Sequence, residues 1–553
     1  TTTQMPRPRQ FLSKWCSLPL VHHAIVLCLL QLLIQAGTSV GHGSRNSGCK
    51  NSVVVFATAE ATPVSTSSHL SASNSVNNIP KNTAFLKNVE TQSDQRTTRK
   101  KRQIHQLLQV QIIHRHGDRT PITPMKNETY WKNQIPSSQM LRQIAKGTRL
   151  VKNEDEKNRH AANGRGPFGQ LTVLGVLEMV ELGSRLRDEL HLFEDDNEEH
   201  ESDDNGTLHL HRGRLFTPRH PLHPRRIKVT STNFPRTIQS VQGLLIGLFP
   251  DSDDNNDEPE QNDAVVDIDT RHTSIMIPDP QPRRTKQQEI LEKKLASRPH
   301  IIEKEYQMRD FALRMTDALS DQLGTGADDV SFGVGEEGDD DDGDVPHKDN
   351  KRKQPLPWSQ LSEITKCLQV RDLLPNSITK DDVQRIASHS AWKWFEHLRH
   401  PPLAKLAMND LVCRIVNVLH DGKNCPRVGC IEQDAPWLHI YSAHDSTLVG
   451  LLCAFQLESP AQWPGYASYL KVELIKVETV TDEEEKELEK DETEATNSNS
   501  NSVRHYVRFS LNGEILPSRL FLLEEKEEGD DDGLPSHMIP LEHLTAMVQD
   551  EAQ

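Results

Sequence analysis

The sequence has few apolar and few aromatic residues for its length. Of its 553 residues, 35% are hydrophobic and only 5% are Phe, Trp or Tyr. A chain of this length could form two to four average domains, but this composition prevents much of it from joining a packed core. We therefore expect globular domains interrupted by solvated segments.

Acidic residues are concentrated in five runs within a chain of net charge −16. The runs are residues 195–199, 251–263, 336–344, 482–492 and 524–532. None has the alternating carboxylates and central glycine of an EF-hand loop, so they do not indicate calcium binding. Blocks of like charge repel one another, so we expect solvated surface insertions.

Cysteine is also scarce, with eight residues and no Cys-x-x-Cys pair. Structural zinc sites normally use such closely spaced thiolates, so we expect no structural zinc. Cys425 and Cys430 bracket a short loop-like stretch and could form a disulfide if the chain is secreted. The sequons at Asn127 and Asn205 would fit a secreted glycoprotein.

The chain lacks a long apolar run as well. Its N-terminal part has basic side chains, then an apolar stretch at residues 24–34, then small residues, and no acid before Glu60. The apolar stretch is shorter than the ~20 residues of a membrane span. This order predicts a signal peptide at residues 1–36 and a secreted or lumenal protein. A membrane-attached signal anchor and an organelle-targeting leader are the alternatives.

A polar segment follows at residues 37–104. It is rich in Ser, Thr and Asn and has little hydrophobic periodicity, which predicts a disordered linker. It contains a basic cluster at residues 99–102, which is either a surface feature or a protease processing site.

The first candidate site follows an apolar run. Residues 107–113 are rich in Leu, Ile and Val, which predicts a buried strand. The charged turn after it contains Arg115, His116 and Arg119. Open α/β sheets bind ligands at the carboxyl ends of their strands, so this turn predicts a binding site for an anionic group.

A second turn follows a short predicted strand at residues 226–230. Apolar residues then recur at helical spacing, with Asn233 as a candidate N-cap and Pro235 in the first turn. Arg236 would lie at the N-terminus of this helix, which already favours an anion. Alone, an arginine at such a position is more often an ordinary surface residue.

A third turn lies between a predicted strand at residues 437–442 and an apolar helix at residues 447–455. It contains His444 and Asp445. In isolation this pair could be no more than a helix cap with a neighbouring histidine.

The three turns together give a sharper prediction. Parallel strands of one sheet would bring them to the same edge, where they would combine fixed cations, imidazole groups and one carboxylic acid. Arginine stays charged, and its guanidinium matches phosphate oxygens two at a time. A phosphate monoester carries about −1.5 to −2 charges at neutral pH. The combination predicts a site for a phosphoryl group.

These motifs resemble those of the histidine acid phosphatases, branch 2 of the histidine phosphatase superfamily. The family pattern Arg-His-Gly-x-Arg-x-Pro is met by residues 115–121, and Ser-Thr-x-x-x-Arg by residues 231–236. The family's His-Asp pair is met by residues 444–445, and its Leu-Thr-x-x-Gly stretch by residues 171–175, before a predicted helix at residues 176–190. Four motifs in the family's order form a strong signal.

Within the family, the chain is most similar to the lysophosphatidic acid phosphatases. Three stretches carry this likeness: residues 231–233, 267–271 and 507–513. One position departs from the pattern, because Thr230 stands where many relatives carry an arginine. One supporting cation is therefore absent.

The resemblance implies an α/β fold, in which a mixed or parallel sheet is flanked by helices and carries a mainly helical cap. We assign the phosphatase core to residues 105–285 and 430–548, and the cap to residues 286–429. Helical pattern within the cap is expected at residues 287–295, 302–319 and 391–419. A hairpin of residues 469–475 and 503–511 would flank one acidic insertion.

The resemblance also implies a mechanism. His116 would attack phosphorus and form a phosphohistidine. Asp445 would donate a proton to the leaving alcohol and then accept one from the attacking water. Four side chains would hold the phosphate oxygens: Arg115, Arg119, Arg236 and His444. We expect no metal and no cofactor, because the arginines would neutralise the charge of the phosphate.

Three functions compete at this point. The first is a phosphomonoesterase acting on lysophosphatidic acid or another small ester. The second is a phytase or another inositol phosphate phosphatase, for which Lys126, Lys132 and Lys146 could hold a polyanion. The third is a non-catalytic protein that binds a phosphate ligand, although the intact nucleophile and proton donor argue against it. We expect a small phosphomonoester or lysophospholipid as the partner, and no nucleic acid.

Overall fold

The computed structural model describes most of the predicted core and cap. The described residues are 101–152, 166–190, 200–202, 208–212, 223–249, 265–271, 276, 285–324, 354–423, 437–481, 503–519 and 537–549. The predicted leader, the linker up to residue 100, the five acidic runs, Asn205, Cys425 and Cys430 lie outside these ranges. None of the described helices is long and apolar enough to cross a membrane.

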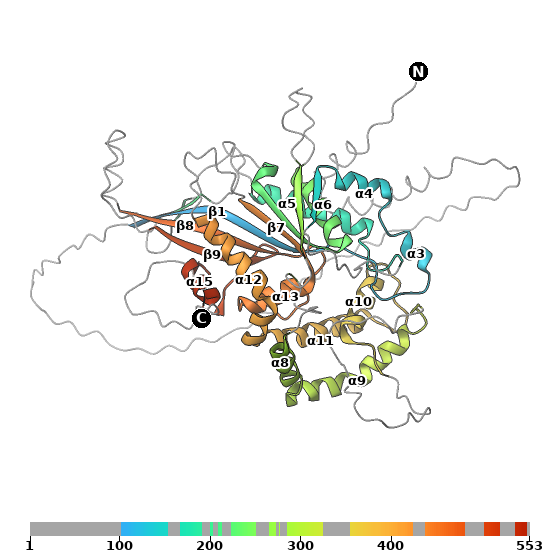
Figure 1. The fold of residues 1–553 in the computed structure, drawn as a ribbon. Helices are drawn as coiled ribbons and strands as arrows, with labels where there is room; N and C mark the ends of the chain where they lie inside the picture. The colour runs from blue at the N-terminus through green and yellow to red at the C-terminus, as the bar shows by residue number, and fades with distance from the viewer. Residues whose placement is uncertain are drawn as a thin grey trace, which may run out of the picture. The chain divides into compact units, whose positions relative to one another are not determined.

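A mixed sheet forms the centre of the described fold (Figure 1). Its main strands are β1 (Lys101–Arg115), β2 (Thr148–Lys152), β5 (Ile227–Thr232), β6 (Val266–Arg271), β7 (Leu438–Ala443), β8 (Tyr469–Thr481), β9 (Val503–Leu511) and β10 (Glu514–Leu516). They are ordered β10-β9-β8-β1-β7-β5-β6-β2. β1 pairs in parallel with β7 and antiparallel with β8, so the sheet changes from parallel to antiparallel at β1.

Three short strands complete the sheet. β4 (Leu208–Arg212) pairs with the first part of β1, β3 (His200–Ser202) pairs with β4, and β11 (Ile539–Pro540) pairs with β9. The predicted strands at residues 107–113, 226–230 and 437–442 are confirmed as parts of β1, β5 and β7. The predicted hairpin is confirmed as β8 and β9. β1 is longer than expected and begins within the basic cluster at residues 99–102.

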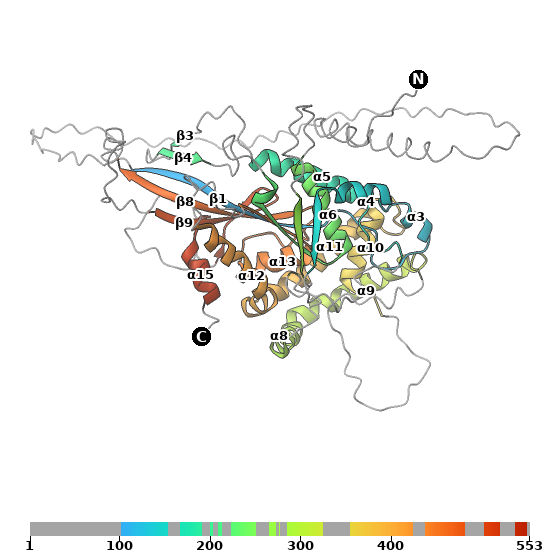
Figure 2. The same ribbon diagram turned by 45° about the horizontal axis from the view of Figure 1, so that its top comes forward.

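Helices cover both faces of the sheet (Figures 1 and 2). α5 (Val173–Leu190) and α6 (Pro235–Leu248) pack with the sheet in one hydrophobic cluster. Their close approach requires glycine, since a Cβ on Gly183 or Gly247 would lie 2.0 Å from a carbonyl oxygen of the other helix. The short α3 (Glu128–Lys132) and α4 (Ser138–Ala145) precede β2 in the chain.

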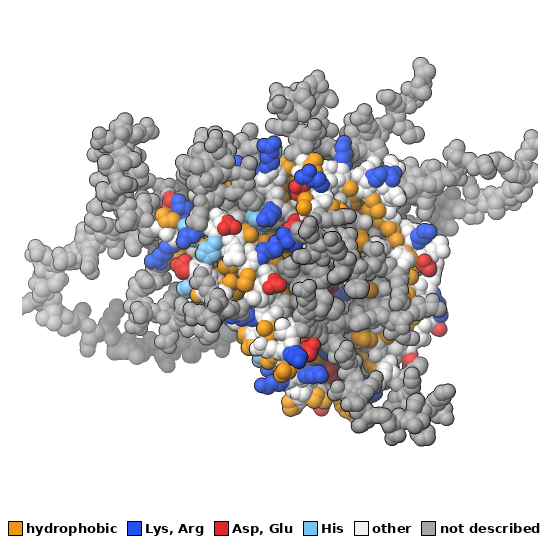
Figure 3. All heavy atoms as spheres, in the orientation of Figure 1, with side chains coloured by type: hydrophobic (Ala, Val, Ile, Leu, Met, Phe, Trp, Pro, Cys, Tyr) orange, Lys and Arg blue, Asp and Glu red, His pale blue; other side chains and the backbone are white. Residues whose placement is uncertain are grey.

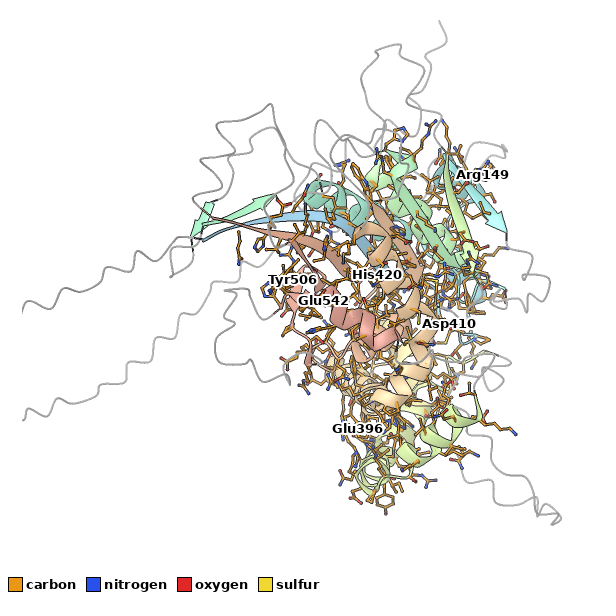
Figure 4. The ribbon with its side chains drawn as sticks, turned by 60° about the vertical axis from the view of Figure 1, so that its left-hand side comes forward. Arg149, Glu396, Asp410, His420, Tyr506 and Glu542 are labelled. Carbon is orange, nitrogen blue, oxygen red and sulfur yellow. The ribbon has the colours of Figure 1, made fainter. Side chains whose placement is uncertain are left out.

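The opposite face carries α12 (Pro401–Lys423), α13 (Asp445–Ala454) and α15 (Leu541–Gln549), which share a second cluster with the sheet. Figure 4 labels His420 on α12 and Glu542 on α15, where the two helices lie side by side. His420 and Thr545 join these helices by a hydrogen bond of 2.5 Å. α12 lies within the range assigned to the cap, but it packs on the sheet because its apolar residues face β1 and β8.

The remaining four helices are mainly those of the cap. They are α8 (Lys286–Ala296), α9 (Pro299–Leu319), α10 (Trp358–Gln369) and α11 (Lys380–Leu398). α9, α10 and the first half of α11 share a third hydrophobic cluster, whereas Leu295 of α8 joins the cluster under α12. The helices expected at residues 287–295 and 302–319 are confirmed as α8 and α9. The helical pattern at residues 391–419 belongs to two helices, because Pro401 and Pro402 cannot continue the ladder of α11 and instead begin α12. The sequence analysis did not predict α10.

The predicted fold class is thus confirmed: a mixed α/β sheet flanked by helices, with a mainly helical cap. The residue boundaries between core and cap stay a prediction. On the face of the molecule seen in Figure 3, Lys, Arg, Asp and Glu side chains are interspersed among hydrophobic ones. Among the residues coloured in this view, the acidic side chains do not gather into one patch.

Candidate active site

The three predicted turns meet at one edge of the sheet. β1, β7 and β5 are parallel neighbours, with Arg115 paired to Ala443 and Ser442 paired to Ser231. Each strand therefore delivers its turn to the same side of the sheet, as expected for parallel pairing. The residues expected at the site are brought together: Arg115, His116, Arg119, Arg236, His444 and Asp445.

His116 is buried, with 2% of its surface exposed. Its Nδ1 lies 2.8 Å from the carbonyl oxygen of Gly117, which can only accept, so Nδ1 carries the proton. Burial lowers the pKa of His116 well below its ordinary value of 6.5, and the nearby arginines, Arg236 first among them, lower it further. The imidazole is therefore neutral, and Nε2 carries the lone pair.

The backbone after His116 fits tightly against α5. A Cβ on Gly117 would lie 2.3 Å from the carbonyl oxygen of Gly175, and a Cβ on Gly175 would lie 2.2 Å from that of Asp118. Thr172 donates hydrogen bonds from its hydroxyl and amide groups to Asp118. The Leu-Thr-x-x-Gly stretch thus holds the loop that carries His116.

Three arginines surround the imidazole without being fully satisfied by the protein. Arg115 pairs with Asp445 at 2.8 Å, Arg119 pairs with Glu363 at 2.8 Å, and Arg236 has no carboxylate partner among the described residues. All three side chains have a buried Nε–H without an acceptor in the part of the chain that the structure describes. Burial, together with Arg119, lowers the pKa of Arg236 to about 9, as expected for a buried cation that lacks a counter-ion.

His444 lies close to both His116 and Arg236. Its ring centroid is 5.5 Å from that of His116, and its Nδ1 accepts a 3.4 Å hydrogen bond from Arg236. Its Nε2 then donates to the hydroxyl of Thr232 at 3.1 Å. Burial and Arg236 lower the pKa of His444 well below 6.5, so this imidazole is neutral as well.

Asp445 is the first residue of α13, and its side chain is still 21% exposed. Its Oδ2 accepts hydrogen bonds from Arg115 and from the indole Nε1 of Trp463, both at 2.8 Å, and its Oδ1 accepts one from the amide of Ser446. Burial alone would raise the pKa of this carboxyl, but Arg115 and Trp463 outweigh it and hold the pKa below its ordinary value. Asp445 is therefore a carboxylate.

Several residues around the site were not found from the sequence. α10 contributes Glu363, which binds Arg119 and the amide of Ile122, and Arg371 just beyond the helix binds Asp118 at 2.5 Å. The segment between α13 and β8 contributes Trp463, which donates to Asp445, and Tyr466. The centre of the Tyr466 ring lies 4.2 Å from the guanidinium carbon of Arg115. In α10 the helical spacing of charged residues is a signal that could have been used; the Trp463–Tyr466 segment offers none.

Other expectations are corrected or stay open. Asn233 is not the N-cap of α6; Phe234 holds that position without a side-chain hydrogen bond, because Pro235 begins the helix. The Oδ1 of Asn233 is buried and accepts no hydrogen bond from the residues that the structure describes. Thr230 is buried in β5, so no cation stands at that position. The three lysines considered for a polyanion are exposed, and so is the sequon residue Asn127. These lysines are Lys126, Lys132 and Lys146.

Comparisons with known proteins match this arrangement. The sequence profile of the histidine phosphatase superfamily (branch 2) matches residues 106–512, which include all four motifs. Counting factor 60 of Dictyostelium discoideum is 23% identical over 390 residues, 66% of this chain and 76% of that protein. A probable acid phosphatase of the same organism is 25% identical over 373 residues, 66% of each chain.

Two further similarities concern named phosphatases. Lysophosphatidic acid phosphatase type 6 of Bos taurus is 26% identical over 188 residues, 32% of this chain and 37% of that protein. The structure of the phytase from Citrobacter braakii is 16% identical, with a TM-score of 0.44, over 80% of this chain and 98% of that one. The profile match covers more than half of the chain and therefore decides the family. The chain belongs to branch 2 of the histidine phosphatase superfamily and is a phosphoric monoester hydrolase.

Proposed function

We propose that this protein is an acid phosphatase that hydrolyses phosphate monoesters through a phosphohistidine on His116. One observation supports this most directly. Among the described residues, three buried arginines around a neutral imidazole have Nε–H groups that no acceptor meets. Buried donors without acceptors are costly unless a ligand supplies the acceptors, and a phosphoryl group supplies three oxygens and the opposite charge.

In the first step, Nε2 of His116 attacks phosphorus, and the P–N bond forms as the ester P–O bond breaks. The Nδ1 proton remains on its hydrogen bond to Gly117 throughout. Three arginines and His444 hold the phosphoryl oxygens as charge shifts to the leaving oxygen. The lowered pKa of His116 keeps the nucleophile unprotonated in mildly acidic solution, which suits an acid phosphatase.

The proton for the leaving alcohol comes from Asp445. In the empty site Arg115 holds this carboxyl ionised, but a bound phosphate shares the charge of Arg115. The pKa of Asp445 then rises, and the carboxyl takes a proton from solvent before it donates that proton to the leaving oxygen. In the second step, Asp445 accepts a proton from water as the water attacks phosphorus. The P–N bond breaks, and inorganic phosphate leaves.

For the substrate, we propose lysophosphatidic acid or another small phosphoester. The subfamily-like stretches of the sequence and the similarity to a lysophosphatidic acid phosphatase support this proposal. Inositol phosphates are the alternative, since their hydrolysis would use the same catalytic residues. The basic, apolar and small residues near the start of the sequence support a secretory or lumenal location, with a membrane anchor as the alternative.

A substrate screen with the purified full chain tests these proposals. Phosphate release is measured at pH 5 on p-nitrophenyl phosphate, lysophosphatidic acid, phytate and a sugar phosphate, with alkali-quenched samples assayed for phosphohistidine. We expect turnover of the first two and a phosphoenzyme that is stable to base and labile to acid. Hydrolysis of phytate alone would favour the inositol phosphate alternative. Binding of phosphate without release from any ester would support the non-catalytic alternative.

A further inference from the structure

The irregular segment between α13 and β8 contacts the reaction centre at more than one point. The carbonyl oxygen of Pro464 accepts a hydrogen bond of 2.5 Å from the guanidinium of Arg115. The partly buried Trp463 donates from its indole Nε1 to Oδ2 of Asp445 at 2.8 Å. The segment therefore touches both an arginine that we assign to phosphate binding and the carboxyl group that we assign to proton transfer.

Asp445 accepts one charged and two neutral hydrogen bonds. Arg115 and Trp463 both donate to Oδ2 at 2.8 Å, and the amide of Ser446 donates to Oδ1 at 2.9 Å. A bound phosphate would share Arg115 with Asp445, but the neutral indole has a single N–H and keeps it on the carboxyl group. With phosphate bound, Trp463 and Ser446 would thus hold one carboxyl oxygen each and fix the plane of the group.

The indole also limits where a proton on Asp445 can lie. Its Nε1–H can only donate, so no proton can lie between Trp463 and Oδ2. The proton that Asp445 delivers must therefore occupy a position that points away from Trp463. This matters for the reaction, because a general acid must lie within hydrogen-bond reach of the oxygen that it protonates.

The position of Trp463 depends in turn on α11. The rings of Trp463 and Trp394 meet edge to face, with centroids 5.3 Å apart and an interplanar angle of 80°. Arg399, at the end of α11, donates a 2.6 Å hydrogen bond to the carbonyl oxygen of Ser459, so the same helix also holds the start of the segment. Figure 1 shows α11 beside α13, the helix that begins with Asp445. These contacts connect the cap to the proton donor.

We propose that Trp463 is a positioning residue, held by Trp394 of the cap, which orients the carboxyl group of Asp445 for proton transfer to the leaving oxygen. The proton moves from a carboxyl oxygen to the ester oxygen as the P–O bond breaks, and the indole keeps its own proton. This inference rests on the proposed function, since it assigns a supporting residue to the same reaction. It concerns esters whose alcohol needs a proton, as does the glycerol oxygen of lysophosphatidic acid.

Two esters measured with the full-length chain test the proposal. Glycerol 2-phosphate needs a proton on its leaving oxygen, and p-nitrophenyl phosphate does not. Trp463→Phe keeps an aromatic ring but has no donor. The ratio of kcat/KM for glycerol 2-phosphate to that for p-nitrophenyl phosphate should fall at least about tenfold, the size expected from losing one hydrogen bond to a charged group. A variant that only damaged the fold would slow both esters alike.

A second replacement keeps the shape of the side chain. 3-Benzothienylalanine in place of Trp463 has a sulfur atom where indole has its N–H, so it fills the same space without the donor. It should lower the ratio of the two esters as much as Trp463→Phe does. An unchanged ratio with this replacement would show that the hydrogen bond has no part in proton transfer.

A double-mutant cycle shows whether Trp463 acts through Asp445. Asp445→Asn removes the proton that is transferred, so it should lower the ratio by itself. Adding Trp463→Phe to Asp445→Asn should then leave the ratio where it is, because two residues that serve one step are not additive. A further fall of the ratio in the double variant would mean that Trp463 acts on the leaving group by another route.

Two neighbouring tryptophans of α11 test the link to the cap. Trp394→Ala removes the ring that holds Trp463, and it should lower the ratio in the same direction but by less. Trp392→Ala is the matched control, because this ring contacts His389 and should leave the ratio unchanged. Equal ratios for the two alanine variants would overturn the link to the cap.

The outcomes separate this inference from the proposed function. If Trp463→Phe slows both esters equally while Asp445→Asn is selective for the alkyl ester, the positioning role is wrong and the proton donor stands. If Asp445→Asn is not selective either, or if neither ester is hydrolysed by the unaltered protein, the proposed function fails and this inference fails with it.

Discussion

The reaction centre has two sides of different construction, the sheet edge and α10. The sheet edge supplies His116, His444 and Asp445 from turns that follow parallel strands, so their positions are fixed by backbone pairing. α10 and the residue just beyond it supply Glu363 and Arg371, whose charges are opposite to those of the loop residues they bind. The sheet edge therefore carries the groups suited to the chemistry, and α10 with the residue after it carries the groups that neutralise Arg119 and Asp118 in the neighbouring loop.

This division predicts that damage to the sheet edge abolishes the reaction and that damage to the α10 side mainly lowers stability. Different contacts hold the two sides in place, so a substitution can disturb one side and leave the contacts of the other intact.

The largest effect is expected for His116→Ala. No other group in this turn can form the covalent intermediate, so turnover should fall by roughly 10⁴- to 10⁶-fold, as when other catalytic nucleophiles are removed. Initial rates on p-nitrophenyl phosphate measure the loss, and alkali-quenched samples should contain no phosphoenzyme. His300→Ala, at an exposed histidine of α9, is the control and should retain normal rates. Substantial turnover by His116→Ala would disprove the role of His116.

Asp445→Asn should give the next largest effect, and one that depends on the leaving group. Loss of a general acid typically costs about 10²- to 10⁴-fold. The full loss is expected for an alkyl phosphate, and a much smaller one for p-nitrophenyl phosphate, because its phenolate leaves without a proton. Initial rates on both esters give the comparison, with Asp267→Asn at an exposed carboxylate as the control. Equal slowing of the two esters would rule out Asp445 as the proton donor.

On the α10 side, Arg371→Met should mainly lower stability. The side chains of Arg371 and Asp118 are only 6% and 0% exposed, so the substitution leaves a buried carboxylate without its counter-ion. Breaking a buried pair in this way typically costs about 3–5 kcal/mol of the free energy of unfolding. Urea denaturation measures the loss, and adding Asp118→Asn should recover part of it.

A surface pair provides the matched control for this prediction. Arg149 of β2 and Asp267 of β6 form a bidentate ion pair, but their side chains are 69% and 47% exposed. Arg149→Met should therefore lower the free energy of unfolding far less than Arg371→Met does. Equal losses of unfolding free energy for Arg149→Met and Arg371→Met would show that the contact of Arg371 with the loop after β1 contributes little to stability.

The smallest effect concerns the dependence of stability on pH. His114, inside β1, has no exposed surface, and burial lowers its pKa from 6.5 to about 4. Between these values the unfolded chain binds a proton that the folded chain does not, so stability falls as pH falls. From pH 7 to pH 5 this histidine alone should cost about 2 kcal/mol.

His114→Gln isolates this contribution. The variant should lose about that much less stability than the unaltered protein between pH 7 and pH 5, as measured by urea denaturation. Glu178 acts in the opposite direction, because burial raises its pKa to about 7, and it is present in both proteins. An identical pH dependence of the two proteins would show that His114 is not held neutral by burial.

The sequence by itself determined the sheet-edge half of the site. Strand periodicity and the order of the turns predicted β1, β5 and β7, and the parallel arrangement placed Arg115, His116, Arg236, His444 and Asp445 at one edge. These features could be predicted because a strand and the turn after it are contiguous in the chain. The break between α11 and α12 had a local signal as well, the two prolines after residue 400, which the helical periodicity obscured.

The tertiary structure alone decided which groups face these turns from distant parts of the chain. Glu363 lies 244 residues from Arg119 in sequence, and Trp463 comes from an irregular segment with no periodic pattern. The lowered pKa values of His116 and His444 likewise follow from burial among arginines. No local sequence pattern indicates this burial. Desolvation and charge pairing depend on distances through space, so they exist only once β1, α6, α10 and α13 have packed around one site.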